Sequence, residues 1–259
     1  MADIDADTLL DMSHGVFAEI AKIERLMSFH DPDSELSHIN REAARGGCAI
    51  SDDMAAVLKT ALTISALSGG RYDLSIAPEL IKKGLLPNVE QARNEGSDWR
   101  DICLVDNRLS FAQPMLLDLG GIAKGYAVDK AFAVICNQVD DVMINAGGDL
   151  RMKQWQGQRV AVKTPSGGES ATVNLPMQDA ALATTANYYF AKGESAIIDP
   201  QAKQVVSDDR SISVFAPSCV VADALTKVVL LAENAIEVVK SMQASAVLIA
   251  QDGTVNNLF

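Results

Sequence analysis

Basic residues are scarce in this chain. Its 259 residues include 22 lysines and arginines but 34 aspartates and glutamates, which gives a net charge of −12. A balance this acidic argues against a nucleic-acid-binding protein, because contacts with phosphate backbones need lysine and arginine. It also argues against binding to anionic membrane surfaces. Any anionic ligand must therefore be held locally, by backbone N–H groups, a few basic side chains or a metal ion.

Cysteine and histidine patterns that signal zinc or hydrolase sites are also missing. The four cysteines show no CxxC spacing, so they predict buried thiols rather than a zinc site. The histidines, His14, His30 and His38, all lie in the first sixth of the chain. This position excludes HExxH zinc sites and catalytic triads with a late histidine.

Long apolar runs are absent too. No run approaches the ~18 residues of a membrane-spanning helix, and the acidic N-terminus lacks the features of a signal peptide. For the sequence as it stands, we expect a soluble, cytoplasmic protein with no membrane span.

The pattern of apolar residues predicts a mixture of helices and strands. A helix is expected over residues 9–27, and a second begins after Ser51 and ends before Gly69 and Gly70. Further helices are expected over residues 124–137, 222–232 and 235–242. Strands are expected over residues 102–105, 108–111, 116–119, 142–144, 160–163, 171–175, 181–184, 211–215 and 246–250. The pattern predicts an α+β fold, a single compact domain over residues 1–259 with mixed sheets and helices in two closely packed lobes.

A double glycine precedes one of the expected helices. Gly120 and Gly121 follow a short apolar run, and Lys124 lies where the helix starts. Glycines allow close approach of the backbone to an anion, and a helix N-terminus offers free N–H donors. The spacing fits neither a P-loop nor the GxGxxG pattern, so an anion site and a plain tight turn remain equal alternatives. A second glycine pair lies within residues 145–149.

Asp223 and Thr226 lie three residues apart on an expected helix, so their oxygens share one face. A carboxylate and a hydroxyl on one face can bind a hard cation such as Mg²⁺. Taken alone, the segment favours the alternative of a carboxylate at a helix start.

Seven segments together resemble one family. Their order and spacing are characteristic, although no single segment is: residues 34–40, 70–78, 118–129, 145–149, 183–185, 197–200 and 222–227. Over nearly the whole chain, they resemble the FAD:protein FMN transferase (ApbE) family. Members of this family bind FAD and, with Mg²⁺, move its FMN half to a threonine of a partner protein, releasing AMP. The resemblance therefore implies FAD and Mg²⁺ as cofactors and a flavoprotein subunit with a target threonine as partner.

The resemblance also implies roles for individual residues. It assigns these contacts with FAD: Met27, Asn40, Lys83, Gly84, Leu85, Asp118, Lys124 and Ile197. It assigns these metal ligands: the backbone carbonyl of Gly121, the carboxylate of Asp223 and the hydroxyl of Thr226. The catalytic residues that it implies are Asp223, Thr226 and Lys227.

The sequence departs from the family pattern at three places. Lys227 stands where the family has threonine, and an ammonium at ~4 Å would repel a divalent cation by ~8 kcal/mol at an effective dielectric constant near 20. Either Lys227 points away, or it replaces one metal ion by contacting the pyrophosphate; the second is preferred. Ala196 replaces a histidine that would serve as base for the acceptor hydroxyl. An aromatic residue expected near Ile50 is missing, so Tyr72 would have to compensate.

Two alternatives to protein flavinylation stay open because of Ala196 and Lys227. One is a FAD-binding or FAD-storage protein, and the other is a FAD pyrophosphatase that releases FMN and AMP. The family also includes periplasmic and inner-membrane-anchored proteins, which is the alternative to a cytoplasmic location. The adjacent Tyr188 and Tyr189 predict one buried and one exposed ring rather than a pair facing the flavin.

Overall fold

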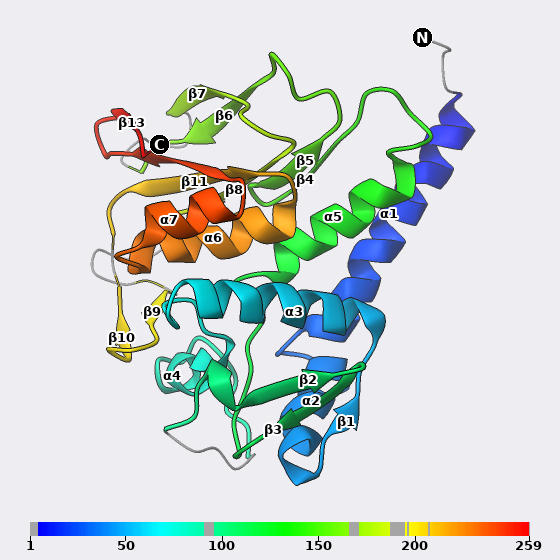
Figure 1. Ribbon diagram of the computed structural model, residues 1–259. Helices are drawn as coiled ribbons and strands as arrows, with labels where there is room; N and C mark the ends of the chain where they lie inside the picture. Colours follow the sequence, from blue (N-terminus) through cyan, green and yellow to red (C-terminus); the bar gives the residue numbers. More distant parts are fainter. Residues whose placement is uncertain are drawn as a thin grey trace.

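A computed structural model describes residues 5–90, 96–165, 171–186, 195, 197–206 and 208–258 of the chain. The largest sheet has six antiparallel strands in the order β13-β12-β11-β8-β5-β4. Their bounds are Val255–Asn257, Ser245–Ile249, Ser211–Ala216, Ala181–Thr185, Asp149–Met152 and Met143–Ala146. Helices α5, α6 and α7 cover one face of this sheet, as Figure 1 shows, with bounds Ala123–Ile135, Cys219–Leu231 and Ala235–Ser241.

A hairpin covers the other face of the sheet. It consists of β6 (Arg159–Lys163) and β7 (Thr172–Pro176), and its apolar side chains join a core cluster with residues of the sheet. The central strand β11 is therefore enclosed on both faces, and all its residues are buried. This explains why its sequence is a continuous apolar and small-residue run rather than an alternating one.

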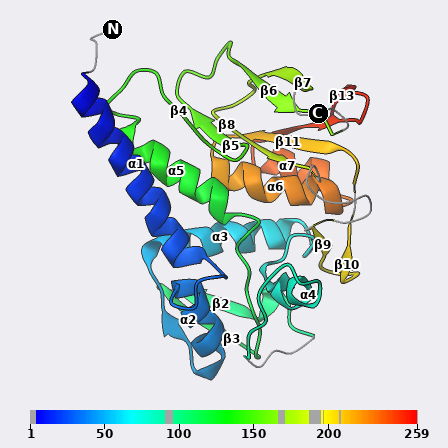
Figure 2. The same cartoon turned by 180° about the vertical axis from the view of Figure 1, so that it is seen from behind.

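The second lobe lies beneath the helical layer. It contains a three-stranded sheet in the order β1-β3-β2, with bounds Cys48–Ala49, Arg108–Phe111 and Ile102–Val105. Helices α2 (Glu35–Glu42), α3 (Asp52–Leu67) and α4 (Ala77–Lys82) complete it, and the short β9 (Ile198–Asp199) and β10 (Gln204–Val205) lie at its edge. The long helix α1 (Ala6–Met27) runs past α5 toward this lobe, which is visible in both views (Figure 2). This arrangement confirms the predicted α+β fold with two packed lobes.

Local sequence signals account for several element boundaries. Ser51 caps α3 by accepting a hydrogen bond from the backbone N–H of Met54 at 3.1 Å. Asp106 and Asn107 join β2 to β3 with positive φ angles of 47° and 55°, as a tight hairpin turn requires. Both features confirm the predicted helix start after Ser51 and the predicted strands over residues 102–105 and 108–111.

The predicted strand over residues 116–119 is wrong. This segment has no regular secondary structure and pairs with no strand among the described residues. Its backbone groups are satisfied differently: the side chain of Asn40 bonds both the N–H and the carbonyl of Leu117, and the N–H of Asp118 donates to the carbonyl of Leu74. A side-chain amide thus replaces the ladder of a neighbouring strand, which periodicity alone does not reveal.

No helix of the described residues combines the length and the apolar character needed to cross a membrane.

Asp53 ties three helices together. It lies in the first turn of α3, and its carboxylate accepts bonds from Lys22 of α1 at 2.7 Å and from Lys130 and the Tyr126 hydroxyl of α5 at 2.9 and 2.8 Å. Burial alone would raise the pKa of Asp53, but these three bonds outweigh it and lower the pKa to about 2. The ionised form of Asp53 therefore stabilises the contact of α3 with α1 and α5.

We expect Asp53→Asn to lower the free energy of unfolding by about 1–3 kcal/mol near neutral pH. Because the pKa of Asp53 is lower in the folded than in the unfolded chain, this stabilisation is complete above ~pH 4 and is lost as the pH falls toward ~pH 2. Urea unfolding of both proteins near neutral pH and at ~pH 3 checks this linkage. An undiminished difference at the lower pH would contradict it.

Candidate functional site

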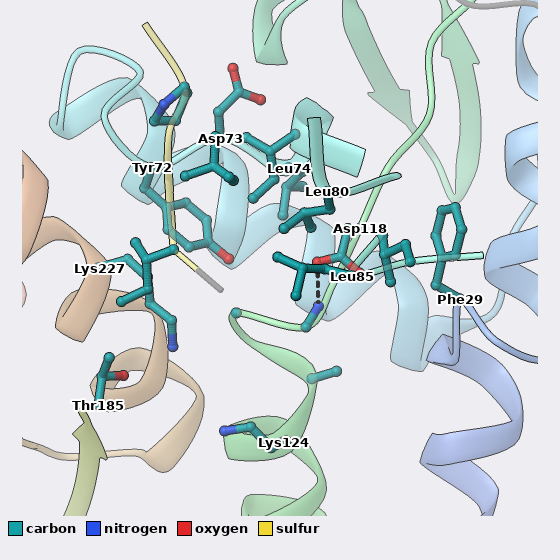
Figure 3. A pocket seen from close by; sticks show the side chains of 18 of the residues that line it. Phe29, Tyr72, Asp73, Leu74, Leu80, Leu85, Asp118, Lys124, Thr185 and Lys227 are labelled. Atoms are coloured by element: carbon teal, nitrogen blue, oxygen red, sulfur yellow. Dashed lines mark hydrogen bonds between the residues drawn. The ribbon is translucent and has the colours of Figure 1, made fainter. Parts of the chain in front are cut away.

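A cavity of about 610 Å³ opens between the two lobes. Its wall comes from the end of α1, the turn before α4 and the segment after it, the double-glycine turn before α5, the end of β8, the strand β9 and helix α6. Figure 3 shows that these side chains separate into an apolar group and a basic group at opposite ends. We call these the apolar end and the lysine end of the cavity.

The apolar end surrounds one carboxylate. Phe29, Leu74, Leu80 and Leu85 lie around Asp118 in Figure 3. The carboxylate of Asp118 accepts a bond from the N–H of Gly120 at 3.1 Å, which closes the double-glycine turn. Burial raises the pKa of Asp118 above its ordinary value. A part-buried carboxylate in an apolar wall is suited to accept hydrogen bonds from a ring system that packs there.

The turn after α4 explains how Leu85 reaches the cavity. Gly84 has a positive φ of 72°, and the N–H of Leu85 donates to the carbonyl of Leu80 at 2.9 Å. This is the geometry of a glycine-terminated helix, in which the residues before and after the turn pack together. Lys83 and Gly84 therefore position Leu85 but do not themselves line the cavity.

The lysine end contains two lysines and two buried aspartates, which we call the charge cluster: Lys124, Asp149, Asp223 and Lys227. The ammonium of Lys124 lies 2.6 Å from Asp149 and 3.7 Å from Asp223. The ammonium of Lys227 lies 2.5 Å from the other oxygen of Asp223. Both lysines line the cavity, whereas the side chains of Asp149 and Asp223 are only 2% and 1% exposed.

The cluster fixes the ionisation of its members. Burial alone would raise the pKa of Asp223, but Lys227 and Lys124 outweigh it and lower that pKa. Burial would lower the pKa of Lys124, yet Asp223 and Asp149 raise it above its ordinary value. Burial, together with the charge of Asp223, raises the pKa of Asp149. At neutral pH, Lys124 is therefore charged and Asp223 is ionised.

Gly125 and the glycine pair before Asp149 do not line the cavity, but they position the members of the charge cluster. Gly147 and Gly148 form the turn between β4 and β5, with positive φ angles of 67° and 101°, and place Asp149 opposite Lys124. Gly125 lies where α5 crosses α6, and its N–H donates to Asp223 at 3.2 Å. A Cβ at Gly125 would come within 2.3 Å of the carbonyl oxygen of Cys219, so the crossing requires glycine.

Thr226 and Thr185 connect β8 to α6. Their hydroxyl oxygens lie 2.8 Å apart, and the Thr226 hydroxyl donates to the carbonyl of Asp223 at 2.7 Å. Thr185 lines the cavity, whereas Thr226 is fully buried behind it.

The structure brings most of the predicted residues together. Those that line the cavity are Met27, Leu85, Asp118, Gly121, Lys124, Ile197 and Lys227. Asp223 and Thr226 lie directly behind this wall, while Asn40 holds the segment that carries Asp118. The roles of all these residues as ligands of FAD or metal stay predictions. Ala196, Tyr188 and Tyr189 lie outside the described residues.

Sequence reasoning missed several residues of the wall. They are Phe29, His30, Arg71, Asp73 and Thr185, and also Asp149 behind it. Arg71 bonds Asp199 at 2.8 Å and so fastens β9 to the cavity. The signal that could have been used is the position of Asp149 directly after a glycine pair, where a hairpin turn ends. Arg71, Asp73 and Thr185 lie in segments that carry the family resemblance but were given no role, and Phe29 and His30 lie outside those segments.

The predicted metal ligands do not fit a divalent cation as they are arranged. One oxygen of Asp223 binds the Lys227 ammonium and the other accepts from Gly125, while Thr226 donates its hydroxyl proton to a carbonyl. Within the described ranges, no group of three or more His, Cys, Asp and Glu side chains could hold a metal ion. A cation bound to Asp223 would have to displace the ammonium.

The chain is similar to known proteins over most of its length. Two relatives carry the name FAD:protein FMN transferase. The protein from Vibrio cholerae is 28% identical over 80% of this chain and 69% of its own length. The protein from Escherichia coli is 23% identical over 96% of this chain and 80% of its own length.

Solved structures show the same fold. The flavin transferase ApbE from Vibrio cholerae superposes with a TM-score of 0.82 at 24% identity, covering 99% of this chain and 89% of that one. The ApbE protein from Thermotoga maritima superposes with a TM-score of 0.78 at 22% identity, covering 99% and 91%. The sequence profile of the ApbE family matches residues 2–249, so the chain belongs to the ApbE family.

Proposed function

We propose that this protein is a FAD:protein FMN transferase, which moves FMN from FAD to a threonine of a partner flavoprotein subunit and releases AMP. The observation that carries the proposal is that one cavity has both an apolar end around Asp118 and a lysine end formed by Lys124 and Lys227. A dinucleotide has both features, because planar rings flank a charged diphosphate. The names of the relatives support the same activity.

In this proposal, the diphosphate lies at the lysine end. Lys124 and Lys227 would donate charge-assisted hydrogen bonds to its oxygens, and the double-glycine turn lets the chain come close to them. A ring of the ligand would pack against the apolar end and the buried ring of Tyr72, whose hydroxyl points into the cavity in Figure 3.

Transfer requires little covalent chemistry from the protein. The threonine hydroxyl of the partner attacks the phosphorus of the FMN half, and the bond between this phosphorus and the bridging oxygen breaks. AMP leaves with that oxygen, and the hydroxyl proton passes to solvent. Phosphoryl transfer of this type depends mainly on positioning and on neutralising charge on the leaving group. The two lysines at the cavity wall supply that charge.

The predicted requirement for Mg²⁺ is the part that the arrangement of the site supports least. The ion would supply Lewis-acid activation of the phosphate, with Gly121, Asp223 and Thr226 as the predicted ligands. The carboxylate of Asp223 is occupied by an ammonium, which the ion would have to displace. Magnesium dependence of the transfer step stays a prediction, as does the cytoplasmic location with its periplasmic or inner-membrane-anchored alternative.

The proposal is tested by incubating the protein with FAD and a threonine acceptor, with and without MgCl₂. The acceptor is a peptide with its target threonine in an Asp-Gly-x-Thr sequence. We expect one FMN unit on the threonine by mass spectrometry and an equal amount of AMP. A peptide with alanine in place of the threonine is the matched control.

Two outcomes would contradict transfer. Release of AMP and free FMN without any acceptor would indicate a FAD pyrophosphatase. Retention of FAD with no product would indicate a FAD-binding or FAD-storage protein.

A further inference from the structure

Lys227 occupies the position at Asp223 that a metal ion would take. Asp223 and Lys227 are one turn apart on α6, so their side chains lie on the same face of the helix. The ammonium of Lys227 donates to the Asp223 carboxylate at 2.5 Å and to the Asp223 backbone carbonyl at 3.1 Å. The carboxylate oxygen and the backbone carbonyl oxygen of Asp223 therefore both bind the Lys227 ammonium.

The same ammonium also faces the ligand cavity. Lys227 lines the wall, and its side chain is 18% exposed. In Figure 3 its nitrogen points toward the space between Thr185 and Lys124. An ammonium has three N–H donors, and Asp223 engages two of them. The third N–H can donate to an anion in the cavity. A metal ion bound to the Asp223 carboxylate would bind the same anion.

A divalent cation would compete poorly for this position. It would need the Asp223 oxygen that the ammonium now holds, and Lys124 lies only 3.7 Å from the other oxygen of the same carboxylate. Two positive charges thus already approach Asp223 from either side. A third cation within ~4 Å of either ammonium would be repelled strongly even at an effective dielectric constant near 20.

We propose that the Lys227 ammonium takes the place of a divalent cation at Asp223, so that this chain binds the diphosphate of FAD without a metal ion at that position. The inference rests on the proposed binding of FAD and adds that the charge on the diphosphate is neutralised by Lys227 and Lys124. FAD affinity is then independent of magnesium. Replacement of Lys227 by threonine would free Asp223 and restore an oxygen donor, which converts the position into a cation site.

The first experiment is a titration with FAD followed by flavin fluorescence, in buffer with EDTA and in buffer with MgCl₂. For the unaltered protein we expect dissociation constants that agree within ~2-fold, since no metal ion is needed. Lys227→Thr should bind FAD ~10–100-fold more weakly in EDTA, because a charge-assisted hydrogen bond is lost. MgCl₂ should recover at least ~10-fold of that loss for the variant alone.

Two further variants separate a specific role of Lys227 from poor folding and from a change in net charge. Lys227→Arg keeps the positive charge and should keep FAD binding independent of magnesium even if Lys227→Thr folds poorly. Lys59→Thr makes the same change on an exposed face of α3, away from the cavity, and should match the unaltered protein in both buffers. Weaker binding by Lys59→Thr equal to that of Lys227→Thr would overturn the assignment, because net charge alone would then explain the effect.

A spectroscopic measurement tests the metal directly. Mn²⁺ serves as a paramagnetic probe for the cation and is titrated by electron paramagnetic resonance in the presence of FAD. We expect no stoichiometric Mn²⁺ site in the unaltered protein and one site in Lys227→Thr. A stoichiometric site in the unaltered protein, or FAD binding that needs MgCl₂, would overturn the inference while leaving the proposed function intact. Absence of FAD binding in both buffers would overturn both.

Discussion

Gly125→Ala is expected to lower the free energy of unfolding by about 3 kcal/mol or more, through overpacking of a helix crossing. A Cβ at this position would lie 2.3 Å from the Cys219 carbonyl oxygen and 2.9 Å from the Cβ of Asp223. The first of these atoms belongs to backbone, so no rotation of a side chain relieves the overlap. The two helices must move apart.

Loss of the close crossing would also disturb the charge cluster. Helix α5 carries Lys124 and helix α6 carries Asp223 and Lys227, so separating the helices lengthens every bond between them. FAD affinity should therefore fall together with stability. Urea unfolding followed by circular dichroism measures the first effect, and the flavin titration measures the second.

Gly15→Ala is the matched control for Gly125→Ala. Gly15 lies within α1, and a Cβ there would meet only the terminal methyl Cγ1 of Val134 at 3.3 Å. Helix propensity favours alanine by about 1 kcal/mol, which offsets the mild contact. Its unfolding free energy should stay within about 1 kcal/mol of that of the unaltered protein. An equally large loss of unfolding free energy in both variants would contradict the prediction that the crossing of α5 and α6 requires glycine at position 125.

Lys124→Met is expected to weaken FAD binding by ~10–100-fold, because a charge-assisted hydrogen bond to the diphosphate is removed. Lys124 lines the cavity and is anchored by Asp149 at 2.6 Å, so its ammonium is held in place before any ligand arrives. The change also leaves Asp149 buried without its partner, so a lower melting temperature should accompany the loss.

The same helix supplies a control for Lys124→Met. Lys130→Met removes an identical charge from α5, but Lys130 pairs with Asp53 and does not line the cavity. Its FAD affinity should stay within ~2-fold of the unaltered value, although its stability falls. Lys124→Arg keeps the charge and should retain most of the affinity. Equal loss of affinity in Lys124→Met and Lys130→Met would contradict a specific role for Lys124.

Elements of the fold with strong local signals were predictable from the sequence. The cap at Ser51 and the turn at Asp106 and Asn107 depend on neighbouring residues, and both lie where expected. The sequence wrongly predicts a strand over residues 116–119. The backbone of Leu117 instead bonds the side chain of Asn40, which lies 77 positions away in the sequence. Local patterns carry no information on such a distant contact.

In the candidate site, too, residues with local sequence signals were predictable, whereas residues that depend on distant contacts were not. Glycine and lysine near the start of α5 leave an anion site and a plain tight turn as equal alternatives in the sequence, and the structure places Gly121 and Lys124 on one cavity wall. The ion pair of Asp223 with Lys227 follows from their helical spacing. In contrast, Phe29 and Thr185 come from distant elements and reach the cavity only through the packing of the two lobes.

Gly125 has a structural role that the sequence does not indicate. It directly follows Lys124 in the chain, and its function is to let α5 approach α6. Only the three-dimensional contact with Cys219 reveals this role.

The most direct test of the account is the crystal structure of the protein grown with FAD in the presence of EDTA. We expect the diphosphate to lie between the ammonium groups of Lys124 and Lys227, with a ring against Phe29 and Leu85. Density for FAD elsewhere on the molecule, or a diphosphate in this cavity that contacts neither lysine, would contradict it.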